Sequence, residues 1–249
     1  MRLVNLLGPD LDAALQGDPA QLTEALSEFH HEDIAELLND LPEEQAIRVV
    51  RLLPNEQAAD VLSRMGDDDQ ERLLQRIGTD EAALLLRDMS PDDRADALQE
   101  LPEDVAEQVL SRIEEIEPEV AEKTRELVSF PEDTAGGLMT TEYIALAPET
   151  KVWEAIDAVR ERSREGAETV YYIYVVAFGN RLVGVVSLRD LILGDSGVTI
   201  EHVMTDNIVQ VTPLTDQEEV AGTIAKYDIS ALPVVDDQHR MLGLVKDIG

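Results

Sequence analysis

The chain has 249 residues, 44% of them hydrophobic and none of them cysteine, and its 53 acidic and 20 basic residues give a formal net charge of −33. The lack of cysteine excludes disulfides, thiolate catalysis and cysteine metal sites, and so acidic a surface repels phosphate backbones, which argues against nucleic acid as a partner. Two interpretations of the charge stay open: a solvated surface adapted to high salt, or a surface that attracts and holds cations.

The beginning of the chain, MRLVNLLGPDLDAALQG, lacks the basic start and long apolar run of a signal peptide. The longest apolar stretch, near residues 171–178, is too short to cross a bilayer. We therefore expect a soluble chain.

A repeat of about 12 residues then runs through the first half of the sequence. Each copy opens with Pro, Gly, Ser or Thr, continues with acidic residues and ends with apolar residues at helical spacing. Proline at a first helical position wastes no hydrogen bond, and acidic residues suit the positive end of the helix dipole. Helices this short are marginal alone, so we predict an all-α superhelix of stacked short helices over residues 1–130. The copies start at Leu41, Leu53, Gly66, Gly78, Ser90 and Leu101, after an earlier one at His30.

Few residues of this stack have a spacing that suggests chemistry. Asp92 and Asp96 are four residues apart on one helix face and could share a divalent cation, although such pairs are more often a solvated face. His30 and His31 have no further ligand at metal spacing, so we interpret them as cap or surface residues.

A junction follows the repeats. Residues 115–130 predict a longer connecting helix that stops before Pro131, as helices commonly do. Gly136 and Gly137 permit backbone conformations barred to other residues and a close approach by another segment. We therefore place a domain junction at residues 131–137.

The second half contains a different duplication, which predicts two α/β copies related by pseudo-twofold symmetry, over residues 131–200 and 201–249. Each copy reads as a Met-Thr pair, a short strand, an amphipathic helix and two apolar strands. At an offset of 65 residues, Met139-Thr140 matches Met204-Thr205, Pro148 matches Pro213 and Thr150 matches Thr215; at an offset of 59, Val175-Val176 matches Val234-Val235 and Gly184 matches Gly243.

The stretches LMTTEYIALAPETKVWEA, GVVSLRD and PVVDDQHRMLGLV resemble a tandem pair of CBS domains. In that family an (S/T)-x-x-D ending commonly holds an adenosine ribose. The resemblance implies a nucleotide site at Tyr172, Ser187, Arg189 and Asp190. The second copy departs from the pattern, because GLVKDIG ends where the matching Asp should come. A second nucleotide site of this kind is therefore not expected, and the last element looks truncated.

Acidic helical repeats followed by EDTAGGLMTTEYIAL, ETVYYIYVV, VSLRDLI and TDQEEVAGTIAKYDISALPVVDD resemble the cytosolic region of an MgtE-type magnesium transporter or channel. The resemblance implies a homodimer through the CBS domains, at the cytoplasmic face of the cell membrane, that regulates a membrane pore domain absent from this chain. Mg²⁺ bound between acidic domain faces would hold the closed gate, and ATP would tune the affinity. The implied Mg²⁺ ligands are Asp60, Asp92, Asp96, Gly137 through its carbonyl, Asp216, Ala225 through its carbonyl, and Asp228.

Two other functions remain open from the sequence. One is a CBS module that senses adenine nucleotides as its main signal, and the other is a helical adaptor that binds proteins through its acidic surface. An enzyme is not expected, because the sequence has no Ser/His/Asp or Cys/His arrangement, no G-x-x-x-x-G-K-[ST] loop and no H-E-x-x-H.

Overall fold

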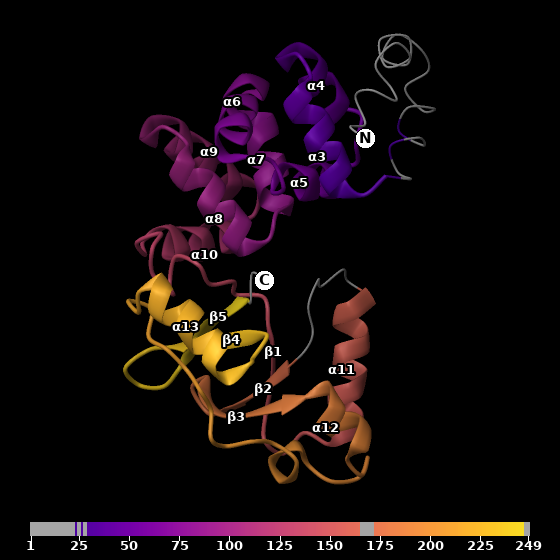
Figure 1. Cartoon of the computed structure of the whole chain (residues 1–249), viewed down its shortest axis with the longest axis vertical. Helices are drawn as coiled ribbons and strands as arrows, with labels where there is room; N and C mark the ends of the chain where they lie inside the picture. Colours follow the sequence, from indigo (N-terminus) through magenta and orange to yellow (C-terminus); the bar gives the residue numbers. More distant parts are fainter. Residues whose placement is uncertain (1–22, 24–25, 27–28, 165–171, 247–249) are drawn as a thin grey trace. The chain divides into compact units, whose positions relative to one another are not determined.

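The computed structural model describes residues 23, 26, 29–164 and 172–246, and the chain divides into two compact units, residues 1–128 and 129–249. The first unit consists of short helices and the second combines helices with small sheets (Figure 1). The predicted all-α superhelix of short helices followed by an α/β pair is confirmed. No helix in the described part of the chain combines the length and the apolar character that spanning a membrane requires.

Each predicted repeat of the first unit forms one helix, but proline does not begin most of them as expected. Pro42, Pro54 and Pro102 occupy the position before the first helical residue, with φ of −56°, −54° and −52°. The proline ring holds φ near this value, and the position needs no N–H donor. Only Pro91, among these repeats, starts its helix as the first residue. The helices are α3 (His31–Asp40), α4 (Glu43–Val50), α5 (Asn55–Leu62), α6 (Asp67–Ile77), α7 (Thr79–Asp88), α8 (Pro91–Glu100), α9 (Glu103–Ile116) and α10 (Pro118–Val128).

The connecting helix predicted over residues 115–130 is wrong. Helix α9 ends at Ile116, Glu117 leaves the helical conformation with a φ of −147°, and Pro118 begins α10. A proline inside a helix would remove one backbone hydrogen bond and clash with the preceding turn, so the helix breaks and restarts there. Helix α10 packs against α8 and α9 and buries Ala121 and Leu127, so it belongs to the first unit.

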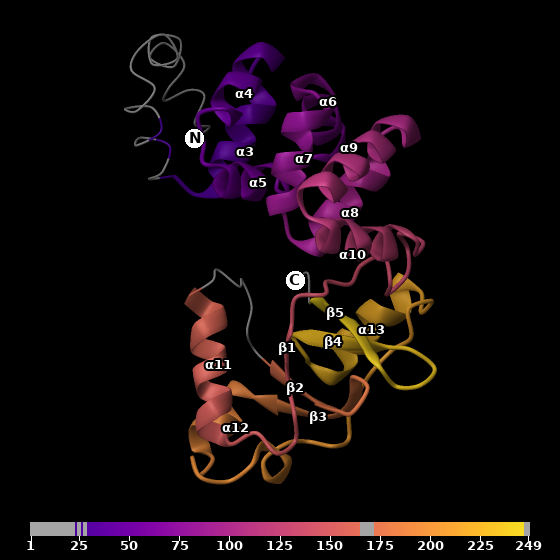
Figure 2. The same cartoon turned by 180° about the vertical axis from the view of Figure 1, so that it is seen from behind.

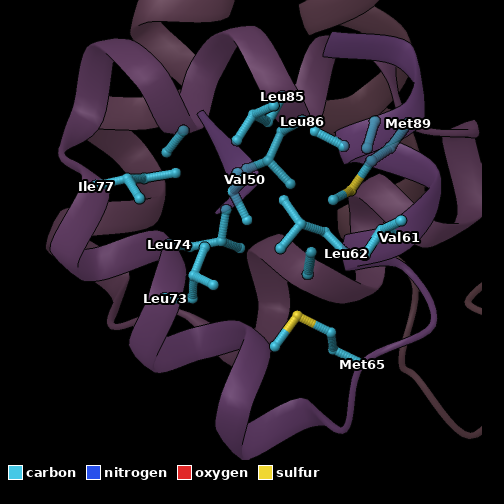
Figure 3. Close-up of a cluster of buried hydrophobic side chains, with 14 of the residues drawn as sticks. Val50, Val61, Leu62, Met65, Leu73, Leu74, Ile77, Leu85, Leu86 and Met89 are labelled. Atoms are coloured by element: carbon cyan, nitrogen blue, oxygen red, sulfur yellow. The ribbon is translucent and has the colours of Figure 1, made fainter. Parts of the chain in front are cut away.

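The helices of the first unit pack in two interleaved rows. Helix α3 contacts α5, α5 contacts α7 and α7 contacts α9, while α4 contacts α6, α6 contacts α8 and α8 contacts α10. Figure 3 shows side chains from α4 to α7 converging between the rows, among them Val50, Leu62, Leu74 and Leu86. Because each helix is too short to be stable alone, this shared apolar core holds the superhelix together.

The second unit contains two α/β copies. In the first copy, β1 (Ile144–Leu146) pairs in parallel with β2 (Tyr172–Ala177), which pairs antiparallel with β3 (Arg181–Ser187). Helix α11 (Val152–Arg164) and helix α12 (Leu188–Leu193) pack together beside this sheet (Figure 2). A 3₁₀ helix, η1 (Ile200–His202), leads to the second copy, which has α13 (Gln217–Tyr227) and an antiparallel pair of β4 (Ala231–Val235) and β5 (Met241–Lys246). The predicted first strand of this copy is reduced to one parallel bridge, from Val211 to Val234.

The two copies exchange their leading segments. Thr140 and Leu244 form two backbone hydrogen bonds of 2.9 and 3.0 Å, so the start of copy 1 pairs with β5 of copy 2. Val185 and Thr205 do the same at 3.0 and 2.9 Å, which pairs the start of copy 2 with β3 of copy 1. The matched methionines and glycines of the sequence repeat meet here, since a Cβ at Gly184 would collide with Met204 and one at Gly243 with Met139. The methionines and glycines that match in the sequence repeat therefore form the interface between the two copies.

Candidate functional site

The four residues implied for nucleotide binding lie together at one end of the β2–β3 ladder. Tyr172 pairs directly with Ser187. The Ser187 hydroxyl donates to Asp190 Oδ2 at 2.6 Å and accepts from the Asp190 N–H at 3.1 Å, while the Ser187 N–H donates to Asp190 Oδ2 at 3.4 Å. This is a capping box for α12, with the exposed Arg189 in its first turn. The (S/T)-x-x-D signature thus has a structural role that is independent of any ligand.

The cation ligands implied on α13 lie at its two ends. Asp216 precedes the helix and its Oδ1 accepts from the Glu218 N–H at 2.8 Å, while Asp228 ends the helix in the left-handed conformation with a φ of 51°. At 1.5 Å per residue, 12 residues separate the two positions by about 18 Å, so they cannot share one ion. Ala225 lies one turn before Asp228, and the Lys226 ammonium lies 4.9 Å from the centre of the Tyr227 ring.

Gly137 belongs to a turn that lies beside Asp216. Thr134 forms a backbone bridge with Asp216, and the Ala135 and Gly136 N–H groups donate to the carbonyls of Thr215 and Pro213 at 2.7 and 2.8 Å. The structure therefore pairs the turn that contains Gly137 with the segment that leads to Asp216.

The two glycines of this turn are required by crowding. Neither has a positive φ, so the unusual backbone conformation that we expected is wrong. A Cβ at Gly136 would lie 2.7 Å from Phe130 Cδ1, and one at Gly137 would lie 2.8 Å from Glu132 Cα. A close approach is present, but it is made by the residues just before the turn and not by another segment, as we expected.

In the first unit, Asp60 lies on α5, half exposed, with its Oδ2 3.4 Å from His31 Nδ1. His30 is the residue before α3 and its side chain makes no cap hydrogen bond. Asp92 and Asp96 both lie on α8, but Asp92 is only 9% exposed whereas Asp96 is exposed. The sequence spacing alone did not distinguish the buried carboxylate from the exposed one.

Between these two residues in the sequence, Arg94 is 5% exposed, and its side chain forms hydrogen bonds to neighbouring helices. Its Nε and Nη2 donate to the carbonyls of Leu86 and Met89 at 2.8 Å, and its Nη1 donates to Thr124 Oγ1 at 3.0 Å. This guanidinium links the end of α7 and the middle of α10 to α8. It therefore holds α8, which contains Asp92 and Asp96, in place against both helices. Within the described residues, no three His, Asp or Glu side chains converge to hold a metal ion on their own.

Tyr174 is a residue that the sequence reasoning missed. It is 1% exposed, its hydroxyl has no hydrogen-bond partner among the residues that the structure describes, and burial, followed by the neighbouring Tyr172, raises the pKa of the phenol well above its usual range. Its ring meets the edge of Tyr143 at a centroid distance of 6.1 Å. Tyr172 and Tyr174 are two residues apart in a strand, and this spacing alone indicates that both side chains lie on one face of β2.

Comparison with known proteins gives one consistent result. The family model of the MgtE intracellular N domain matches residues 29–133, and that of the CBS domain matches residues 135–196 and 200–248. The chain is 45% identical over 130 residues to the magnesium transporter MgtE of Thermus thermophilus, a match that covers 52% of this chain and 29% of that protein. The chain thus spans less than a third of that relative.

Two solved structures match nearly the whole chain. The cytosolic domain of the Mg²⁺ channel MgtE in complex with ATP is 40% identical, with a TM-score of 0.85 over 95% of each chain. The soluble part of a magnesium transporter is 30% identical, with a TM-score of 0.86 over 95% of this chain and 92% of that one.

Proposed function

Because the chain belongs to the MgtE family of magnesium transporters, we propose that it is the Mg²⁺-sensing cytosolic region of such a protein. The observation that carries the proposal is the match in sequence and fold, over 95% of both chains, to the cytosolic domain of an Mg²⁺ channel. In this proposal the chain carries out no catalysis. It forms a homodimer through its CBS domains at the cytoplasmic face of the membrane and acts on a pore domain.

The mechanism follows from charge. A formal net charge of −33 creates repulsion within and between acidic faces, and bound cations reduce it. Mg²⁺ prefers carboxylate and carbonyl oxygens and keeps several of its waters, so a few ligands from each face suffice. An ion at 100 times its dissociation constant that binds only the closed state stabilises that state by about 2.7 kcal/mol. We propose that bound Mg²⁺ holds the gate closed and that falling Mg²⁺ releases it.

The proposed Mg²⁺ ligands fall into separate groups. Gly137 and Asp216 contribute to one position in the second unit, and Ala225 and Asp228 contribute to another at the far end of α13. The ligands proposed in the first unit are Asp60, Asp92 and Asp96.

The test replaces Asp216 with asparagine, which still accepts the Glu218 N–H and so keeps the helix cap while removing the charge. Calorimetric titration with MgCl₂ should show Asp216→Asn losing one class of binding, or at least about tenfold in affinity, with an unchanged melting temperature without Mg²⁺. Asp237→Asn is the matched control, an exposed carboxylate of the same unit outside the proposed positions. Equal Mg²⁺ binding by both variants and the parent would contradict the assignment.

A second function, adenine-nucleotide sensing by the CBS pair, is favoured by a specific observation. The four residues implied for it lie together, and the 40% identical structure is a complex with ATP. We propose that Asp190 accepts hydrogen bonds from the ribose hydroxyls while Tyr172 lies against the base. The two functions are compatible, because a nucleotide bound to the CBS pair could tune the affinity for Mg²⁺.

Asp190→Ala would remove the helix cap together with the ligand group, so it cannot separate the two roles. Asp190→Glu keeps a capping-box carboxylate while moving it by one methylene. We expect Asp190→Glu to bind ATP at least about tenfold more weakly by calorimetry, with a melting temperature near that of the parent. Unchanged ATP affinity in Asp190→Glu would rule out the ribose contact.

A further inference from the structure

His31 and Asp60 meet in the first unit from two helices that are separate in the sequence. His31 is the first residue of α3, Asp60 lies in the last turn of α5, and the two helices pack against each other (Figure 1). The His31 Nδ1 lies 3.4 Å from Asp60 Oδ2, and the two side chains are 34% and 46% exposed, so a solvated ion can reach both. The sequence spacing around His31 showed no metal ligand, because folding supplies the carboxylate.

The separation of these two atoms fits two ligands of one tetrahedral metal ion. A usual N–H···O hydrogen bond joins atoms about 2.7–3.2 Å apart, which is less than the 3.4 Å between His31 and Asp60. Zn²⁺ binds imidazole nitrogen and carboxylate oxygen at about 2.0–2.2 Å, so two such ligand atoms at a tetrahedral angle lie about 3.4 Å apart. Neighbouring ligand atoms of an octahedral Mg²⁺ lie about 2.9 Å apart. The geometry therefore favours Zn²⁺ over Mg²⁺.

The backbone that carries the two side chains is fixed by packing. Ile34 and Leu37 of α3 and Ala59 and Leu62 of α5 are fully buried in the shared core of the first unit. The histidine and the aspartate therefore stand in place before an ion arrives, and binding requires little ordering of the chain.

The charges around the pair also suit a cation. Arg64 is the neighbouring positive group, and other atoms hold it: its Nε donates to Glu32 Oε1 at 3.0 Å, and its Nη1 donates to the backbone carbonyl of Asp60 at 2.6 Å. Asp33 adds a further acidic residue in the first turn of α3, and the end of α5 carries the partial negative charge of the helix dipole.

We propose that His31 Nδ1 and Asp60 Oδ2 bind a Zn²⁺ ion, with water completing its coordination. Imidazole nitrogen suits Zn²⁺, whereas Mg²⁺ prefers oxygen ligands, so the histidine gives this position a selectivity that carboxylates do not provide. Two protein ligands leave the ion exchangeable, unlike the four protein ligands of a structural zinc site. Because Asp60 is also a proposed Mg²⁺ ligand, Zn²⁺ bound here would compete with Mg²⁺ for its carboxylate.

The test is a calorimetric titration of the whole chain with ZnCl₂ in excess MgCl₂, which fills the sites made of oxygen ligands. His31→Asn removes the ring nitrogen and keeps an amide that can donate to Asp60. We expect it to weaken Zn²⁺ binding at least about tenfold, since losing even an indirect partner of a metal ligand costs about that much. Its Mg²⁺ affinity should equal that of the parent.

The matched control is His202→Asn in the second unit. The His202 Nδ1 also lies beside a carboxylate, 3.7 Å from Glu201 Oε1, but it is 2.8 Å from Thr199 Oγ1 on the same short segment. This variant should bind Zn²⁺ as the parent does, whereas Asp60→Asn should show the same loss as His31→Asn.

Nuclear magnetic resonance of the imidazole groups gives a second measurement. The chain has four histidines, and Zn²⁺ should shift the resonances of His31 first. Equal Zn²⁺ affinity in His31→Asn and the parent, or a first shift at another histidine, would overturn the proposal. The inference does not require Mg²⁺ sensing: a parent that binds Zn²⁺ at His31 without any response to Mg²⁺ would refute the proposed function and leave this site standing.

Discussion

Asp190 and Asp216 each hold the start of a helix with the same carboxylate that we propose for ligand binding. Such residues are stable in place before any ligand arrives, because the backbone N–H groups of the helix fix them. The same double use explains why alanine substitutions would give ambiguous results at both positions. Substitutions that keep the cap, to asparagine or glutamate, separate the two roles.

Tyr174 gives a prediction at this scale. Its buried hydroxyl has no hydrogen-bond partner in the described part of the chain, so Tyr174→Phe should raise the free energy of unfolding by about 1 kcal/mol. Tyr143→Phe is the control, because the Tyr143 hydroxyl accepts from Asn180 Nδ2 at 3.3 Å and donates to the Met241 carbonyl at 3.4 Å. That variant should lose stability in the same urea titrations, and a loss in Tyr174→Phe would contradict the prediction.

Tyr174 also makes the stability of the folded chain depend on pH. Burial raises the pKa of this phenol in the folded chain, so the unfolded chain releases the proton first, near pH 10. Above that pH the unfolded state binds fewer protons than the folded state, and stability falls as pH rises. Urea titrations should show this alkaline loss in the parent and a smaller loss in Tyr174→Phe.

Among the elements, those with local signals were predictable from the sequence and those with long-range causes were not. Proline, glycine and acidic residues marked each helix start of the first unit, because capping depends on neighbours in the chain. The break at Pro118 was predictable by the same rule and was missed, because the acidic pattern continues across it. The pairing of alternate helices was not predictable, since it depends on which apolar faces meet.

The candidate site divides in the same way. The resemblance to CBS domains implied the cluster of Tyr172, Ser187 and Asp190, whereas the strand pairing and the capping box that bring these residues together were seen only in the structure. The burial of Asp92 beside the exposed Asp96 could not, because it depends on helices far away in the chain. The separation of Asp216 from Asp228 follows from helix length alone.

The exchanged interface gives a prediction about an element. A Cβ at Gly243 would lie 2.6 Å from the backbone carbonyl oxygen of Thr140, whereas at Gly184 it would meet only the flexible side chain of Met204. Gly243→Ala should therefore cost about 1–3 kcal/mol of stability and Gly184→Ala less. Gly222→Ala, with open space around it in α13, should stabilise the chain instead. Equal melting temperatures for the two interface variants would show that the Thr140 carbonyl moves freely.

For the whole molecule, the prediction concerns the origin of the acidity. If the acidic faces hold specific Mg²⁺ ions, MgCl₂ should reduce the radius of gyration in small-angle scattering more than NaCl at equal ionic strength. The difference should diminish in Asp92→Asn/Asp96→Asn, with Asp206→Asn/Asp237→Asn, two exposed carboxylates of the second unit, as the control for the loss of two charges. Equal compaction in both salts would indicate simple screening and favour salt adaptation as the origin of the charge.

The exchange of leading segments has a consequence for how the chain folds as it is synthesised. Thr140 emerges 104 residues before Leu244 (244 − 140), the residue with which it pairs. The first copy therefore leaves the ribosome with its Met-Thr segment unpaired, and this segment pairs only after β5 has been made. Contacts of such long sequence separation slow folding, so we expect the helical superhelix to form early and the CBS pair to close in one late, joint step.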